Sequence, residues 1–304
     1  MTTPTTTGSR IGTDVFEDTI AEMTWYEVEA AAKAGAVLLW AFGVIEQHGP
    51  HLPTGTDVYL PSARLRDVRR VLAARGIQAL IVPPYYWGVN VVSGAFPASY
   101  RVKPQTMAAL MGDVFESLES DGFSRVFCFS GHGDALHNRT IVEGIAIGRE
   151  RTKMDIGFVI EDALAARLGL DFADPRLALH PVRAPEAPFR FMQITGSSPA
   201  GAVVAADAAP RYVDVHAGQW ESSMMLCSVP GLVRDEVRQT LKPTNYGPDV
   251  LAEWRHGFER ARAKTPLGYF GDPAAGSLEE GLRALAESAQ RAADAIEARL
   301  AAKN

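Results

Sequence analysis

Two imidazole and two carboxylate side chains lie close together in the stretch GVIEQHGPHLPTGTD, residues 43–57. They belong to Glu46, His48, His51 and Asp57, and they follow an apolar run that is typical of a buried strand. Imidazole nitrogen and carboxylate oxygen suit Zn, Mn or Fe, and the absence of a nearby cysteine argues against a closed structural zinc site. The stretch is either an ordinary polar loop or one part of a metal centre.

Two later segments carry the same kinds of side chain. SGHGDALHN (130–138) contributes His132 and Asp134, and VDVHAGQWESS (213–223) contributes His216 and Glu221. Five of the seven histidines in the chain fall within the three segments, namely His48, His51, His132, His137 and His216. This concentration favours a shared site over histidines scattered on the surface.

The number of candidate ligands indicates two ions rather than one. A tetrahedral ion with an open position uses three protein ligands, whereas two ions about 3.5–4 Å apart need more ligands and share a carboxylate. Asp57 is the natural shared ligand, because a short side chain in the first turn of a helix is held rigidly. Taken singly, His132 is also consistent with a tight turn and Asp134 with a helix N-cap. His51 and His137 are consistent either with support of the ligands or with plain surface.

The elements that position these residues alternate between strand and helix. Short apolar runs predict strands at 36–42, 77–84, 124–131 and 155–160, and helical periodicity predicts helices at 60–76, 103–122 and 134–150. This order predicts an α/β fold with a mostly parallel sheet and helices on both faces. Ligands bind beyond the carboxyl ends of such strands, so we expect the segments after the first and third strands to meet in one crevice. A Pro/Ala-rich stretch at 174–212 is expected to be a loop or a lid, and residues 277–304 an Ala-rich helix.

Composition excludes several classes of protein. The chain has 304 residues and a formal net charge of −6, which gives no electrostatic grip on nucleic acid or on acidic lipid. Two cysteines and no signal-peptide pattern predict a cytoplasmic protein without disulfides, and the longest apolar run, 34–45, is too short to span a bilayer. Residues 1–12 are expected to form a disordered tail and 13–304 a single domain. A dinucleotide-binding fold is excluded, because no G-x-G-x-x-G follows the first strand.

Four motifs resemble those of the creatininase family of metal-dependent hydrolases. They are EQHGPHLPTGTD, GHGD, HAGQWES and GYFGDP (268–273), and the similarity extends over about residues 35 to 290. The resemblance implies a single-domain, three-layer fold with a mostly parallel central sheet flanked by helices. It also implies two divalent metal ions per chain (Zn or Mn, with Fe possible), a small-molecule substrate, and a homo-oligomer such as a hexamer.

Position by position, the resemblance implies roles for individual residues. The implied metal ligands are Glu46, His48, Asp57, His132 and Asp134, and the implied catalytic residues are His216 and Glu221. Because Asp134 and Glu221 are both present, either of them completes the metal shell, and the choice stays open. The expected substrate contacts are Tyr100, Arg101, Phe189, Phe191 and Trp220.

The chain departs from the family pattern in a loop and in its aromatic residues. Ser93 replaces a histidine, Ala98 a glycine and Ser99 a threonine of the usual loop motif. Creatinine-hydrolysing members close over the flat ring with tryptophans, but this chain has no tryptophan between Trp87 and Trp220. The expected substrate is therefore a small cyclic amide, ureide or formamide rather than creatinine.

Two alternative functions stay open at this point. The first is ring opening of a cyclic polyol ketone of the keto-inositol type by carbon–carbon cleavage, which the loss of the aromatic lid favours. The second is a metal-binding maturation factor without turnover. Neither nucleic acid nor a membrane is an expected partner.

Overall fold

The computed structural model describes residues 14–180, 193–195 and 212–302. In chain order the first half contains α1 (Trp25–Lys33), β1 (Val37–Phe42), α2 (Thr56–Ala74), β2 (Ala79–Tyr85), α3 (Pro104–Ser120), β3 (Arg125–Ser130), α4 (Ala135–Arg151), β4 (Asp155–Glu161), α5 (Asp162–Arg167) and β5 (Leu177–His180). The second half contains β6 (Gln193–Thr195), β7 (Tyr212–Asp214), α6 (Gln219–Ser228), α7 (Asp235–Thr240), α8 (Pro248–Trp254), α9 (Phe258–Lys264) and α10 (Leu278–Ala301). The tail predicted at 1–12 lies outside the described residues.

The main sheet has five strands in the order β2-β1-β3-β4-β5. All four neighbouring pairs are parallel, which confirms the predicted mostly parallel sheet. β1 and β3 are adjacent in the centre, with Phe42 paired to Ser130 at their carboxyl ends. The segments that follow these two strands therefore leave the sheet side by side, as the sequence predicts.

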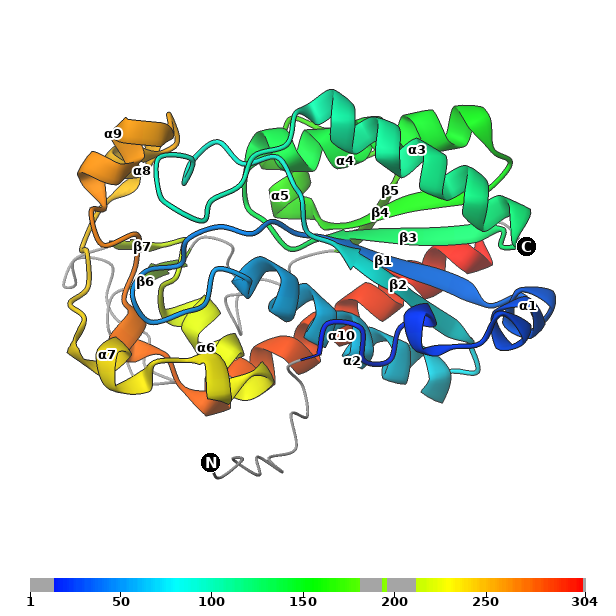
Figure 1. Ribbon diagram of the computed structural model, residues 1–304, viewed down its shortest axis with the longest axis horizontal. Coiled ribbons are helices and arrows are strands. Elements are labelled where there is room, and N and C mark those ends of the chain that lie inside the picture. Colours follow the sequence, from blue (N-terminus) through cyan, green and yellow to red (C-terminus); the bar gives the residue numbers. More distant parts are fainter. Residues whose placement is uncertain (1–13, 181–192, 196–211, 303–304) are drawn as a thin grey trace, which may run out of the picture.

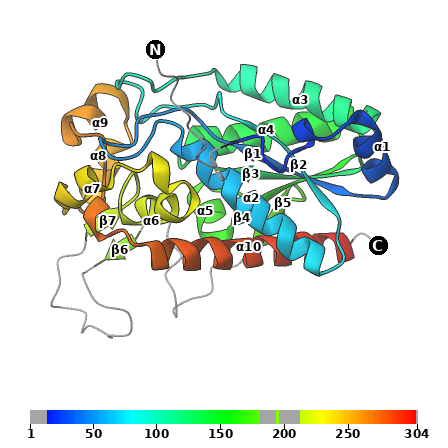
Figure 2. The ribbon, with the colours of Figure 1, turned by 60° about the horizontal axis from the view of Figure 1, so that its bottom comes forward.

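Helices cover both faces of the sheet and give three layers (Figure 1). Alternate residues of β1 point to opposite faces. Leu38, Trp40 and Phe42 pack with α3 and α4, whereas Leu39 and its neighbours pack with α2 and α10. Figure 2 shows α10 running along α2 on the second face. Because both faces are covered, all six residues of β1 are buried, which explains its continuous apolar sequence.

Two glycines let the start of α2 approach the ends of β1 and β3. A Cβ added to Gly43 would lie 2.0 Å from the backbone oxygen of Asp57, and one added to Gly131 would lie 2.5 Å from the same atom. Any larger residue at either position would push α2 away from the sheet. The glycines thereby place Asp57, in the first turn of α2, directly over the strand ends.

Three expectations about the elements need correction. Residues Leu177–His180 form β5, an edge strand, although the stretch 174–212 was expected to be irregular. The strand predicted at 77–84 does not end at its proline pair but continues to Tyr85, because β2 is the other edge strand and its prolines need no partner on the open side. α2 begins at Thr56, one turn before the predicted start. Within the described residues, no helix is long and apolar enough to cross a membrane.

Candidate metal centre

Asp57 lies between two histidines that come from different strand ends. Its Oδ1 is 3.2 Å from His48 Nε2, and its Oδ2 is 2.8 Å from His132 Nδ1. His48 follows β1, and His132 follows the adjacent β3. Each oxygen of this carboxylate thus faces a separate imidazole.

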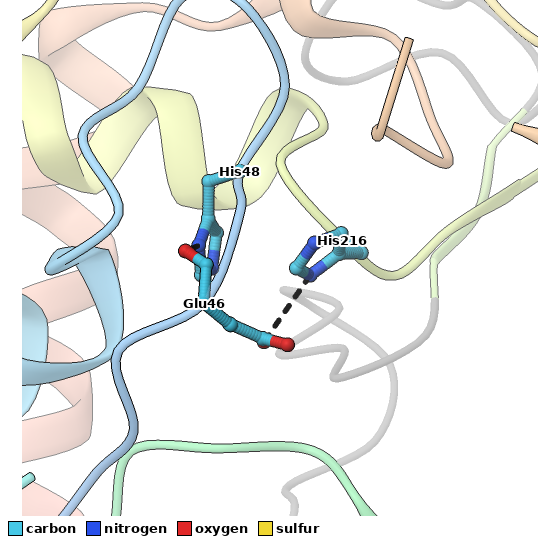
Figure 3. A group of neighbouring side chains, drawn as sticks. All are labelled: Glu46, His48 and His216. Atoms are coloured by element: carbon cyan, nitrogen blue, oxygen red, sulfur yellow. Dashed lines mark hydrogen bonds and ion pairs between the residues drawn. The ribbon is translucent and has the colours of Figure 1, made fainter. Parts of the chain in front are cut away.

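Six side chains form three overlapping groups whose ligand atoms lie within 4.8 Å of one another. The groups are Glu46–Asp57–His132, His48–Asp57–Glu221 and Glu46–His48–His216. Figure 3 shows the third group, with His216 facing Glu46 from a separate segment of the chain. The structure thereby brings together four of the five predicted metal ligands and both predicted catalytic residues.

The arrangement of these donor atoms suits the binding of divalent ions better than hydrogen bonds between the side chains. His48 Nε2 and Asp57 Oδ2 are buried, and among the described residues neither has a hydrogen-bond partner despite the short approaches just given. Unpaired buried polar atoms are costly, so buried donor atoms that converge without being aligned for hydrogen bonds are suited to hold a cation. Three carboxylates and several imidazoles are also the donor set that Zn or Mn takes in catalytic centres.

The electrostatics of the cluster lead to the same conclusion. Burial disfavours the charged form of His48, but Asp57, Glu221 and Glu46 outweigh it and raise the pKa of His48 to about 10. The pKa of His132 is raised in the same way, against burial, by Glu46 and Asp57. Without a metal ion, protons on the imidazoles balance the buried carboxylates. A divalent cation would take over that role.

The structure separates the roles of Asp134 and Glu221. Asp134 caps α4: its Oδ1 accepts from the backbone N–H of Leu136 at 2.7 Å, and its Oδ2 accepts from that of Val91 at 2.9 Å. It belongs to none of the three groups found among the described residues. Glu221 does, with its Oε2 3.7 Å from His48 Nε2. This geometry favours Glu221 over Asp134 for completing the metal shell.

His216 is held by the late motif of the sequence. Its backbone pairs with Phe270 of the GYFGDP motif in an antiparallel bridge, and its Nε2 lies 2.8 Å from the carbonyl oxygen of Gln47. Asp214, two residues earlier, accepts from the N–H groups of Gln219 at 2.6 Å and Asp272 at 3.0 Å. The late motif therefore fixes the segment that delivers His216, a role that sequence reasoning did not assign.

Polar neighbours hold the ligands in place. Ser93 donates a hydrogen bond to Glu46 Oε2, and Asn90 Nδ2 donates to the same oxygen at 3.1 Å. His51 and His137 are fully buried rather than at the surface. His51 Nε2 pairs with Ser222 Oγ at 3.0 Å and so ties the first motif to α6.

The loop departures are accommodated locally. Ser99 Oγ accepts from the backbone N–H of Gln47 at 3.0 Å, so the hydroxyl that a threonine would offer is kept. Ala98 has φ +56°, a left-handed conformation that favours the glycine of the family pattern.

A cavity of about 400 Å³ opens onto the cluster. Its walls include Glu46, Asp57, His132, His216 and Glu221 together with Val91, Leu251, Trp254, Arg139, Arg167 and Arg255. Trp254 lies beside His216, with 5.8 Å between the ring centroids. Sequence reasoning missed this ring, because it sought aromatic residues only before the HAGQWES motif. The size and mixed lining suit a small organic substrate.

Three of the five predicted substrate contacts are absent from the described lining of this cavity. Tyr100 is 52% exposed, and the Arg101 guanidinium lies over the Phe258 ring at 5.1 Å. Neither appears in the described lining of the cavity, and Trp220 lines a smaller cavity beside it. Phe189 and Phe191 lie outside the described residues.

Comparisons with known proteins agree with the four motifs. The family profile for creatininase, described as creatinine amidohydrolase, matches residues 21–296. Creatinine amidohydrolase of Pseudomonas putida is 33% identical over 132 residues, which cover 41% of this chain and 48% of that enzyme. The chain thus matches about half the length of that relative. The mycofactocin precursor peptide peptidase of Mycolicibacterium smegmatis is 25% identical over 263 residues, 86% of this chain and 84% of that protein.

A solved structure shows the same fold. The manganese form of a creatininase superimposes with a TM-score of 0.64 and 24% identity, over 92% of this chain and 97% of that one. The three-layer architecture is therefore shared over nearly the whole length of both chains.

Proposed function

The chain belongs to the creatininase family, whose members are hydrolases, and on that basis we propose that it is a metal-dependent hydrolase of a carbon–nitrogen bond next to a carbonyl. The proposed substrate is a small cyclic amide, ureide or formamide. The proposed cofactor is a pair of divalent ions, Mn or Zn.

The position of Asp57 carries this proposal. Its two oxygens face His48 and His132 at 3.2 and 2.8 Å, and it belongs to two of the three ligand groups. A carboxylate shared in this way is the usual link between two ions. Glu46, Asp57 and His132 would hold one ion, and His48, Asp57 and Glu221 the other.

With two divalent ions bound, the site would have an acidified water as nucleophile and a polarised carbonyl oxygen. The side chains around them supply position and proton transfer. Ser93 and Asn90 orient Glu46 through its Oε2, which leaves Oε1 toward His132, 3.1 Å away.

His216 is the proposed proton carrier. Burial and the charge of His48 lower its pKa to about 4, so its imidazole is neutral near pH 7. His216 Nε2 lies 2.8 Å from the carbonyl oxygen and 3.0 Å from the side-chain amide nitrogen of Gln47, and Nδ1 lies 3.8 Å from Glu46. We propose the tautomer in which Nε2 donates to the carbonyl oxygen and Nδ1 keeps its lone pair. Nδ1 can take a proton from the attacking water and return it to the leaving nitrogen.

The cavity wall favours an amide over a polyol ketone. The ketone hypothesis depends on the loss of an aromatic lid, but Trp254 supplies an aromatic residue beside His216. A peptide amide is a second candidate, because the peptidase relative aligns with 86% of the chain.

The test combines metal analysis with a substrate panel. Protein reconstituted with Mn²⁺ or Zn²⁺ is assayed on lactams, ureides, formamides, short peptides and cyclic polyol ketones, with Asp57→Asn as the inactive control. Turnover of an amide together with about two ions per chain supports the proposal. Turnover of the ketone alone supports carbon–carbon cleavage, and full metal occupancy with no turnover supports a maturation factor.

A further inference from the structure

A second cavity, of about 70 Å³, lies next to the metal cluster. The ends of β3, β4 and β5 line it together with α2, α6 and α10. Glu221 lines both cavities, so its side chain is a shared wall. Apart from Glu221, the polar residues that line this second cavity have no role in the function proposed above. We call it the Arg64 cavity.

Arg64 lines this cavity, and one hydrogen-bonding edge of its guanidinium is unused. Its Nε and Nη2 are buried and have no hydrogen-bond partner among the residues that the structure describes. Arg299 uses its own Nε and Nη2 to bind the Asp155 carboxylate, at 3.1 and 2.6 Å. The same edge of Arg176 binds Asp174. Two other arginines of this protein thus use the Nε–Nη2 edge, which stays unpaired in Arg64, to bind a carboxylate side-on.

His180 lines the same cavity and is equally unsatisfied. It is 1% exposed, and within the described part of the chain neither ring nitrogen has a hydrogen-bond partner. Burial, with the nearby charges of Arg64 and Arg291, lowers its pKa to about 3. The ring is therefore neutral and offers one N–H donor.

Glu161 is an acidic residue that lines the same cavity, but it does not form a hydrogen bond with the unpaired atoms of Arg64, Nε and Nη2. The charge of Glu161 acts on Arg64 all the same. Burial raises the pKa of Glu161, although Arg64 and Arg291 act in the opposite direction. Arg64 and His180 thus both line the cavity with hydrogen-bonding groups that stay unused among the described residues.

We propose that the Arg64 cavity binds a small carboxylate, held side-on by Nε and Nη2 of Arg64 and contacted by His180. One water molecule needs a cavity of roughly 10–15 Å³. A cavity of about 70 Å³ therefore has room for a group the size of acetate. A buried guanidinium cannot lose its proton, and a bound carboxylate removes the cost of leaving it unpaired. The proposal does not depend on the metal ions.

Thermal unfolding with acetate tests the proposal. Acetate is compared with acetamide, its neutral analogue, at constant ionic strength. The wild type and Arg70→Met, an exposed position on the same helix, are expected to gain about 5 °C at acetate a hundredfold above its Kd. Arg64→Met is expected to show no acetate response, and in acetate-free buffer to unfold no earlier than the wild type, because it removes a buried charge.

Two results would overturn the site. One is no saturable response of the wild type to acetate, which would mean that water fills the cavity. The other is an equal response in Arg64→Met. Should Arg64→Met fail to fold, His180→Phe serves instead, and it is expected to weaken acetate binding at least tenfold while Arg64 stays in place.

A second arm identifies the source of the carboxylate. N-formyl ω-amino acids with one to five methylene groups between formamide and carboxylate are added to the Mn²⁺-loaded protein. If the carboxylate belongs to the substrate, one chain length stabilises the protein more than acetate does, because it reaches both cavities. If a separate acid binds, no length exceeds acetate.

Discussion

The Nε2 atom of His216 lies 2.8 Å from the backbone carbonyl oxygen of Gln47. Gln47 lies between Glu46 and His48 in the first motif, whereas His216 comes from a segment 169 residues later. The contact therefore holds the imidazole in its orientation from a segment far along the chain. The other ring nitrogen, Nδ1, faces Glu46 at 3.8 Å.

Replacement of His216 by alanine tests its role as proton carrier. We expect kcat to fall about 10²- to 10⁴-fold, the usual contribution of a general acid–base group, with metal content unchanged. Elemental analysis and steady-state kinetics on the substrate found in the panel check this. His256→Ala, at an exposed position, is the control. Loss of an ion in His216→Ala would instead make His216 a ligand.

The choice between Asp134 and Glu221 is tested by a pair of amide variants. Glu221→Gln is expected to lose the ion shared with His48, because Glu221 completes that group. Asp134→Asn is expected to keep both ions, since its oxygens already accept backbone N–H groups, and to cost about 1 kcal/mol or less of stability as a weaker cap of α4. Metal content and urea unfolding separate the two. Metal loss in Asp134→Asn alone would reverse the assignment.

Local patterns made much of this site predictable. The apolar runs that become β1 and β3 are continuous because both sheet faces are covered, and their carboxyl ends bring Glu46 and His132 together. Asp57 was predictable for the same reason, since it opens the helix that follows β1.

Other features depended on contacts that no local pattern encodes. Trp254 reaches the cavity from α8, far along the chain from any motif, and pairs through Nε1 with Thr265 at 2.9 Å. Asp134 has the residue type of a ligand, and only the position of the Val91 backbone shows that its second oxygen is occupied. β5 was missed because it is an edge strand of four residues within a Pro/Ala-rich stretch.

Metal binding should release protons. The pKa of His48 is raised to about 10, so this imidazole is protonated near pH 7 in the metal-free protein, and it must be neutral to bind an ion. Glu221, with a pKa raised to about 8 by burial, must also lose its proton. We therefore expect more than one proton released per chain at pH 7, and metal affinity that rises with pH. Calorimetry in buffers of different ionisation enthalpy measures this. Affinity independent of pH between 6 and 9 would contradict it.

The hydroxyl of Ser93 should tune metal affinity from outside the ligand set. Ser93 donates a hydrogen bond to Glu46 Oε2, which also accepts one from Asn90 Nδ2. Ser93→Ala removes one of these two donors, and we expect metal affinity to fall about 10- to 100-fold, as is usual when a group that orients a ligand is lost. Competition with a chelator gives the affinity. Ser130→Ala serves as the control, because that hydroxyl bonds to the backbone of His132 and not to a carboxylate.

The buried neutral ring of His180 should make the fold sensitive to acid. Its pKa in the folded protein is about 3, whereas an imidazole in the unfolded chain titrates near 6.5. The unfolded state therefore binds a proton first as the pH falls, so the stability that a neutral His180 contributes is complete above pH 6.5 and is lost progressively toward pH 3. We expect the wild type to lose a few kcal/mol more than His180→Gln between pH 7 and pH 4. Urea unfolding at a series of pH values measures the difference, with His256→Gln as an exposed control. Parallel curves for the wild type and His180→Gln would show that the ring is not held neutral in the folded protein.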